Sequence, residues 1–149
     1  MKTIKLFFLL CLSFSLSNCA SVNPKLITKN PPFSIEASSY NFWVGGLPGI
    51  SGKRVILKVN ATKEVVFESI YFQGLVEKIQ LKTLNNKEYL LGDFNTSTRE
   101  ENKPINTISK EEFPFKLNEN EAMLGFIHKG KRKYFKVLNI KKTETDFYP

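Results

Sequence analysis

Apolar and polar residues alternate along most of the chain after about residue 34. Between Lys53 and Asn60, the residues Val55, Leu57 and Val59 take every second position, and mainly polar or charged residues lie between them. Such alternation is typical of a β-strand, in which successive side chains point to opposite faces of the sheet. The pattern predicts about seven to nine short strands and no helix. Comparable runs lie at residues 35–44, 65–72, 75–84, 121–128 and 131–140.

Two asparagines, Asn85 and Asn86, separate two of these runs. Asparagine tolerates a positive φ angle, which a tight hairpin turn requires. A turn at this place would pair Leu81 with Leu90 and would bring apolar side chains together on one face. The turn residues and the apolar pattern therefore predict the same hairpin.

The clearest hairpin is expected around Lys129-Gly130, between two more alternating runs. A two-residue turn here would pair Leu124 with Phe135 and Phe126 with Lys133. The three apolar side chains would then lie on one face, which we expect to point into the core.

Regular turns between alternating strands are typical of an all-β, antiparallel β-sandwich. An immunoglobulin-like topology is the favoured arrangement, and a small β-barrel is the second, because strand count alone does not decide closure. We expect this β-sandwich domain to span residues 35–140, followed by a polar tail at 141–149. The stretch from residue 95 to residue 113 is polar and has little periodicity, so it is expected to be the longest loop.

The first residues have the pattern of an export signal. Lys2 and Lys5 precede eleven mostly apolar residues, 6–16, which suit the core of a signal peptide and are too few to span a bilayer. The sequence Leu16-Ser17-Asn18-Cys19 follows. It resembles the lipobox of bacterial lipoproteins, although Asn stands where Gly, Ala or Ser is usual.

This resemblance implies that residues 1–18 are removed, that Cys19 carries lipid, including a palmitate-like acyl chain, and that residues 19–34 form a tether. Two or three acyl chains on one residue give stable membrane attachment, whereas one chain gives marginal binding. The alternative is an ordinary secretory signal cut near Ser15–Ser17, which would leave Cys19 as a free thiol. The lipid-anchored protein is expected in the cell envelope at the outer membrane, on its periplasmic or its external face.

Composition narrows the chemistry that the chain can perform. Its 149 residues carry a formal charge of +8, with 42% hydrophobic content, one His and two Cys. Cys11 lies in the expected signal and Cys19 in the lipobox, so the mature domain has no disulfide and no thiol. These numbers exclude most zinc sites and Cys/His catalytic pairs. We expect a domain without metal or cofactor, held together by its core.

Three sets of residues are candidates for binding or catalysis. Lys129, Lys131, Arg132 and Lys133, beside Tyr134, form a basic hairpin tip that suits lipid phosphate or an acidic glycan, not nucleic acid, in an exported protein. Trp43 is expected to face outward if its neighbour Phe42 fills the core, and would then offer a contact for a partner. Acidic pairs at residues 100–101 and 111–112 leave open a small carboxylate-dependent hydrolase or an accessory subunit of an envelope enzyme.

A glycine-rich segment, residues 45–53, does not fit a phosphate-binding loop. Five residues lie between Gly46 and Gly52, whereas the phosphate-loop motif has four between its glycines. A strand is also expected after Lys53, where the motif opens a helix. The simpler interpretation is a loop between two strands.

Four segments resemble a group of small, uncharacterised lipoproteins from Bacteroidota-type bacteria. The segments are Phe42–Gly46 with Ser51-Gly52, Glu68–Gly74, Phe115–Ala122 and Lys133–Lys136. Residues 47–50 depart from that pattern, because a glycine-rich segment is usual there. The resemblance implies a lipid-anchored envelope protein and no known activity, so it carries over no functional residue. The expected function is non-enzymatic binding or scaffolding, with an envelope protein or an acidic glycan as partner.

Overall fold

The computed structural model describes residues 23–62, 64–99 and 114–149, and in them it shows ten β-strands and one short 3-10 helix. The helix η1 spans Pro24–Leu26. The strands are β1 Phe33–Val44, β2 Ser51–Ala61, β3 Val65–Phe72, β4 Leu75–Lys78, β5 Gln80–Leu84, β6 Lys87–Asn95, β7 Ala122–His128, β8 Lys131–Val137, β9 Lys141–Lys142 and β10 Asp146–Phe147.

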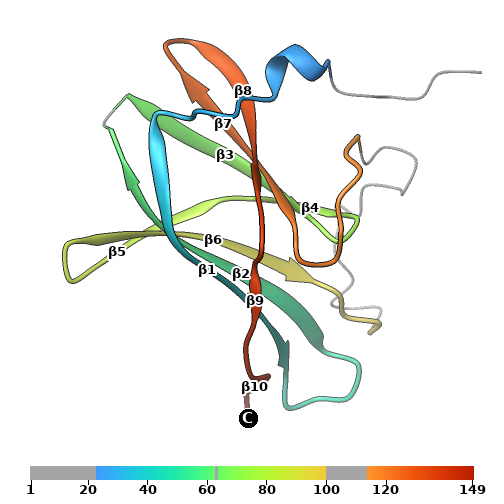
Figure 1. The fold of residues 1–149 in the computed structure, drawn as a ribbon. Coiled ribbons are helices and arrows are strands. Elements are labelled where there is room, and N and C mark those ends of the chain that lie inside the picture. Colours follow the sequence, from blue (N-terminus) through green and yellow to red (C-terminus); the bar gives the residue numbers. More distant parts are fainter. Residues whose placement is uncertain (1–22, 63, 100–113) are drawn as a thin grey trace, which may run out of the picture.

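The strands form two sheets that pack face to face (Figure 1). One sheet has the order β10-β1-β2-β6-β5, with β9 also on the edge of β1, and the other has the order β4-β3-β7-β8. With β1 to β8 read as strands A, B, C, C′, D, E, F and G, these orders are A-B-E-D and C′-C-F-G of an immunoglobulin-like sandwich. The described strands form no closed barrel, so the second choice of fold is wrong.

The predicted hairpin registers are confirmed. Leu81 pairs with Leu90, and Leu124 pairs with Phe135. Positive φ angles occur at Asn85 and Asn86, as the first turn requires, and also at Lys129-Gly130 in the second turn.

The run at residues 75–84 forms two strands in different sheets, not one strand as the pattern suggested. β4 pairs with β3, whereas β5 pairs with β6 in the opposite sheet. The chain changes sheets at Ile79, whose N–H donates to the carbonyl of Glu68. Alternation cannot reveal such a crossing, because both strands keep the same period of two. Leu81 is 56% exposed on the edge strand, although its partner Leu90 is buried.

Alternate residues of both sheets fill the space between them. Val55 and Leu57 of β2 face Leu124 and Phe126 of β7, and the exposed fraction of each is zero. Phe33 at the start of β1 contacts the Phe126 ring edge-on, with 5.0 Å between centroids. The described residues contain no cysteine and therefore no disulfide, so this apolar layer is the main source of their stability.

A second, smaller cluster lies on the outer face of the β3–β7–β8 sheet. Met123 and Tyr134 are buried there beneath Phe115, which belongs to the segment preceding β7. The Phe115 and Tyr134 rings meet at 5.1 Å. Residues 115–117 form no strand, because this segment crosses the outer face and does not join a sheet edge.

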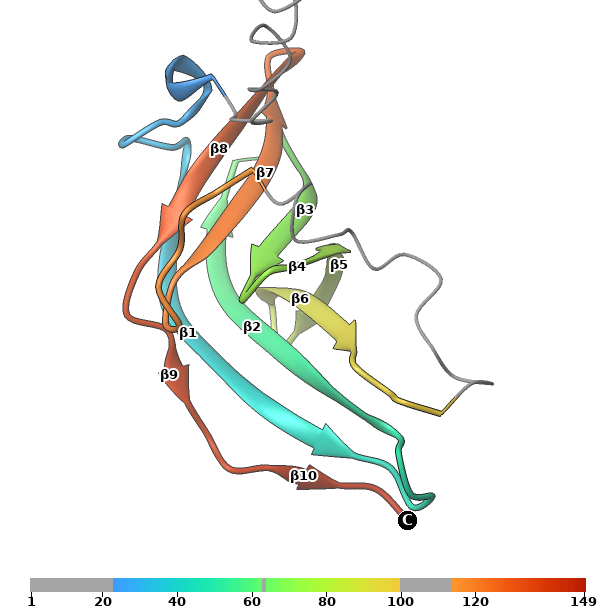
Figure 2. The same cartoon turned by 90° about the vertical axis from the view of Figure 1, so that its right-hand side faces the viewer.

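The C-terminal tail lies along the edge of β1, parallel to it (Figure 2). Ser39 and Tyr40 pair with β9, and Trp43 and Val44 pair with β10. The sequence predicted only a polar tail at residues 141–149. It covers the backbone groups of an edge strand that would otherwise be open to another chain.

The N-terminal segment also contacts the domain. Thr28 donates its backbone N–H to the carbonyl of Tyr134, and Ile27 forms an isolated parallel bridge with the same residue. β1 begins at Phe33, two residues before the expected domain boundary. The part of the expected tether from residue 23 onward therefore lies on the domain.

We predict that Phe126→Ala lowers the free energy of unfolding by about 3–5 kcal/mol, because it opens a cavity between the sheets. Phe147→Ala is the matched control, since that ring is 78% exposed, and it should change stability by less than about 0.5 kcal/mol. Urea unfolding followed by circular dichroism measures both values. Equal losses in the two variants would contradict the assignment of the core.

Candidate functional site

The basic hairpin tip projects from one end of the sandwich. Lys129, Lys131 and Arg132 are exposed, and Lys133 is half-buried. Arg132 donates two hydrogen bonds to the carboxylate of Glu68, from Nε at 2.7 Å and from Nη2 at 3.0 Å. This hydrogen bonding lowers the pKa of Glu68. The carboxylate compensates the positive charge of Arg132. The three lysines have no carboxylate partner among the described residues.

Tyr134 does not belong to this exposed tip. Its side chain is buried in the outer-face cluster with Phe115 and Met123, and burial raises the pKa of its hydroxyl. The ring also covers Gly125 on the neighbouring strand. Tyr134, predicted as a partner contact, therefore packs inside the domain and is not part of the exposed tip.

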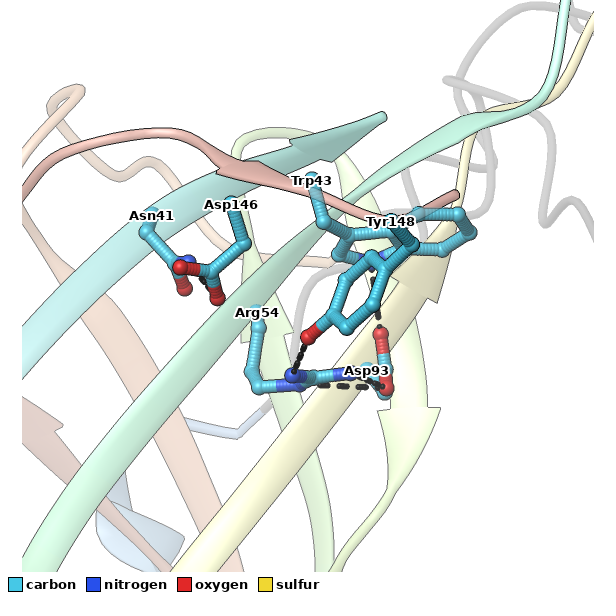
Figure 3. Close-up of polar contacts among 6 residues, drawn as sticks. All are labelled: Asn41, Trp43, Arg54, Asp93, Asp146 and Tyr148. Atoms are coloured by element: carbon cyan, nitrogen blue, oxygen red, sulfur yellow. Dashed lines mark hydrogen bonds and ion pairs between the residues drawn. The ribbon is translucent and has the colours of Figure 1, made fainter. Parts of the chain in front are cut away.

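Trp43 faces away from the inter-sheet core, as alternation with Phe42 predicted, but it is enclosed by polar groups (Figure 3). Its indole N–H donates to Asp93 Oδ1 at 2.8 Å. The ring lies against Gly52, where no side chain would fit. Trp43 therefore fills a place on the sheet surface, and its hydrogen-bonding group is already used.

The same polar network fastens the C-terminal tail. Arg54 donates to Asp93 from Nε at 3.2 Å and from Nη2 at 2.6 Å, and its Nη1 donates to the Tyr148 hydroxyl at 3.0 Å. Asn41 Nδ2 donates to Asp146 at 2.6 Å. Every group in the network has a partner, so its evident role is to hold the tail on β1 (Figure 3).

A cleft opens at the other end of the sandwich, where β1 and β2 extend past the shorter sheet. These strands have 12 and 11 residues, whereas β7 and β8 have seven each. The inner face of the longer sheet is therefore uncovered beyond Tyr40. The resulting cleft has a volume of about 810 Å³ and is lined by Tyr40, Phe42, Gln73, Gly74, Phe115, Lys116, Leu117, Asn118, Glu119, Glu121, Lys136 and Lys142.

Two ammonium groups flank the Phe42 ring. Lys142 lines the cleft, whereas Lys53 lies beside the lining and is hydrogen-bonded to Gln73, which belongs to it. Lys142 Nζ lies 4.9 Å from the ring centroid, and Lys53 Nζ lies 5.6 Å from it. These are cation–π distances, and the contact orients both side chains. Lys53 comes from β2 and Lys142 from β9, so the tail supplies part of the site.

Lys53 carries a partly desolvated charge without a counter-ion. Its Nζ donates to Gln73 Oε1 at 2.7 Å, and burial lowers its pKa. Neither Lys53 nor Lys142 has a carboxylate within ion-pair distance in the described part of the chain. An anion in the cleft would relieve the cost of burying the Lys53 charge.

Glu121, one of the two carboxylates that line the cleft, is held as a charged group. Glu121 accepts the backbone N–H of Asn118 at 3.0 Å and the ammonium of Lys136 at 3.1 Å. These two contacts lower the pKa of Glu121, whereas a general acid needs a raised pKa. The acidic pairs at residues 100–101 and 111–112 lie outside the described residues.

Sequence reasoning missed this cleft, but one signal pointed to it. Lys53 has the same parity as Val55, Leu57 and Val59, so it points to the core face of β2. A lysine at a core position requires either a polar partner or an opening in the core. Phe42 is its cross-strand neighbour.

The structure and the comparisons add three negative findings. The described residues contain no group of three or more His, Cys, Asp or Glu side chains able to hold a metal ion. Within the same ranges, no helix has the length and apolar content to cross a bilayer. No protein-family model, curated protein or solved structure matches the chain.

We predict that Glu121→Gln destabilises the domain at neutral pH and that its difference from the wild type disappears in acid. The pKa of Glu121 is lowered in the folded state, so its contribution is present above about pH 4.5 and is lost as the pH falls through the folded pKa. Urea unfolding at pH 7 and pH 3 measures the difference. Glu119→Gln is the control and should be neutral at both pH values. A Glu121→Gln difference that persists at pH 3 would contradict the linkage.

Proposed function

We propose that this chain is a lipid-anchored, non-enzymatic binding protein of the bacterial cell envelope, and that its cleft binds an acidic glycan. The observation that carries the proposal is the Phe42 ring in an open cleft, flanked by the ammonium group of Lys142 from the cleft lining and by that of Lys53 beside it. The immunoglobulin-like fold alone would not support a particular function, because such folds serve many.

The lipid anchor is supported by the order of features in the first residues. A basic start, an apolar segment of eleven residues and the sequence Leu16-Ser17-Asn18-Cys19 occur in the order that lipoprotein export requires. The mature chain then has no cysteine other than Cys19. Acylation at Cys19 would place the domain at the outer membrane.

The glycan ligand is supported by the chemistry of the cleft lining. Aromatic rings give flat apolar surface for a sugar ring, and amide and hydroxyl groups give hydrogen bonds. Lys53 and Lys142 would pair with carboxylate or sulfate groups on the sugar. An open cleft accommodates an extended chain with little reorganisation.

We predict that Cys19→Ala releases the protein from membranes. The acyl chains would supply most of the attachment, so the variant should appear in the soluble or secreted fraction. Cell fractionation with metabolic labelling by a palmitate analogue measures both attachment and acylation. Cys11→Ala is the control and should remain labelled. If Cys19→Ala is retained and labelled like the wild type, the anchor assignment is wrong.

We predict that Lys142→Met weakens binding of a galacturonic acid oligomer at least about 10-fold, because it removes one of the two charges on the Phe42 ring. Lys141→Met is the matched control, with the same loss of charge on the same short strand but outside the cleft lining. Its affinity should change less than about twofold. Isothermal titration calorimetry with the acidic oligomer and a neutral galactose oligomer measures both effects.

Two results would contradict the cleft assignment. One is equal affinity for the acidic and the neutral oligomer. The other is an equal loss of affinity in Lys141→Met and Lys142→Met, which would indicate attraction by overall charge.

A further inference from the structure

The way the N-terminal segment is attached limits how far the domain can lie from a membrane. The chain from Asn23 onward is held on the domain, since Asn23 caps η1 and Thr28 donates to the carbonyl of Tyr134. Only four residue steps separate Asn23 from Cys19. Fully extended, they span at most about 14 Å. A lipid on Cys19 therefore keeps η1 close to the bilayer surface.

The end of the domain that carries η1 also carries the basic hairpin tip. Ile27 and Tyr134 pair in parallel, so the chain before Ile27 runs toward the start of β8. Both ribbon views place η1 and the turn between β7 and β8 at the same end of the molecule (Figures 1 and 2). The short link to Cys19 thus starts at the basic end.

We propose that this end is a membrane-docking surface, made of Lys25, Lys129, Lys131 and Lys133, that binds anionic lipid headgroups and fixes the orientation of the domain. The inference rests on the proposed lipid anchor. None of the four ammonium groups has a carboxylate partner among the described residues. The nearby carboxylates are already engaged, Glu68 with Arg132 at 2.7 Å and Glu64 beside His128 at 3.5 Å.

Apolar side chains complete this surface. Leu26 and Ile27, next to Lys25, are each 39% exposed. Exposed apolar residues among lysines suit the interface between headgroups and acyl chains, where the apolar part is buried and the ammonium groups stay with the phosphates. Lysines are attracted to an anionic leaflet over about one Debye length, which is longest at low salt. At low or physiological salt, a link that is not fully extended holds these lysines within that distance of the bilayer.

Docking at this end determines where the cleft points. β7 runs from Ala122 near the cleft to His128 at the hairpin tip, with Glu121 and Lys129 just beyond its ends. At about 3.4 Å per residue, the cleft lies roughly 25 Å from the tip. Membrane docking at the tip would therefore hold the cleft away from the bilayer, open toward the surrounding compartment.

The test uses the acylated protein, purified from membranes and inserted in vesicles of phosphatidylcholine alone or with 30% phosphatidylglycerol. A water-soluble amine reagent labels exposed lysines, and mass spectrometry measures the rate at each position. We expect labelling of Lys129 and Lys131 to fall at least about 3-fold with phosphatidylglycerol, and to recover in about 0.5 M salt. Lys116 and Lys141, at the cleft end, are the controls and should label equally in both vesicles.

Each outcome has one meaning. If the protein does not float with either kind of vesicle, the lipid anchor of the proposed function is wrong, and docking is wrong with it. If it floats but Lys129 and Lys131 label equally in both vesicles, the anchor stands and docking is wrong. Protection of Lys116 and Lys141 in place of the hairpin lysines would also overturn the proposal, because the domain would then lie the other way up.

Discussion

Burial of apolar side chains between two sheets is the constraint on which the rest of this structure depends. The described residues contain no cysteine, so buried side chains such as Val55 and Leu57 on one sheet and Leu124 and Phe126 on the other must stabilise them. The edges of this core are closed by other means. The C-terminal tail covers the free edge of β1, and the segment around Phe115 covers part of an outer face. Each closure brings polar or charged groups to the rim of the core.

The cleft is a direct consequence of that packing. Strands of unequal length leave the inner face of the longer sheet uncovered, and a lysine takes the position that an apolar side chain would otherwise fill. Water or a ligand can then satisfy Lys53 further, since among the described residues its ammonium group donates to the amide oxygen of Gln73 alone. Lys53 at a core position weakens the core, and it also places a partly desolvated positive charge beside an open site.

The two ends of the sandwich differ in charge and in attachment. The hairpin end joins the short link to Cys19, and its lysines have no carboxylate partner in the described part of the chain. The cleft end combines lysines with Phe42, Glu119 and Glu121. Rigid strands separate the two ends, so the orientation of one fixes the other. Trp43, the one tryptophan of the sequence, belongs neither to the hairpin tip nor to the cleft lining. It closes the network that ties Tyr148 to Arg54 and Asp93.

Alternation and turn residues determined the all-β class, the strand positions and the hairpin registers, because these depend on contacts between chain neighbours. Only the tertiary structure decided which sheet each strand joins. The crossing at Ile79, the docking of the tail and the burial of Tyr134 all involve residues far apart in sequence. The cleft belongs to this second group. The sequence shows that Lys53 takes a core position. It does not show that β1 and β2 extend past the opposite sheet and leave this position open. Relative strand lengths across two sheets are set by long-range packing.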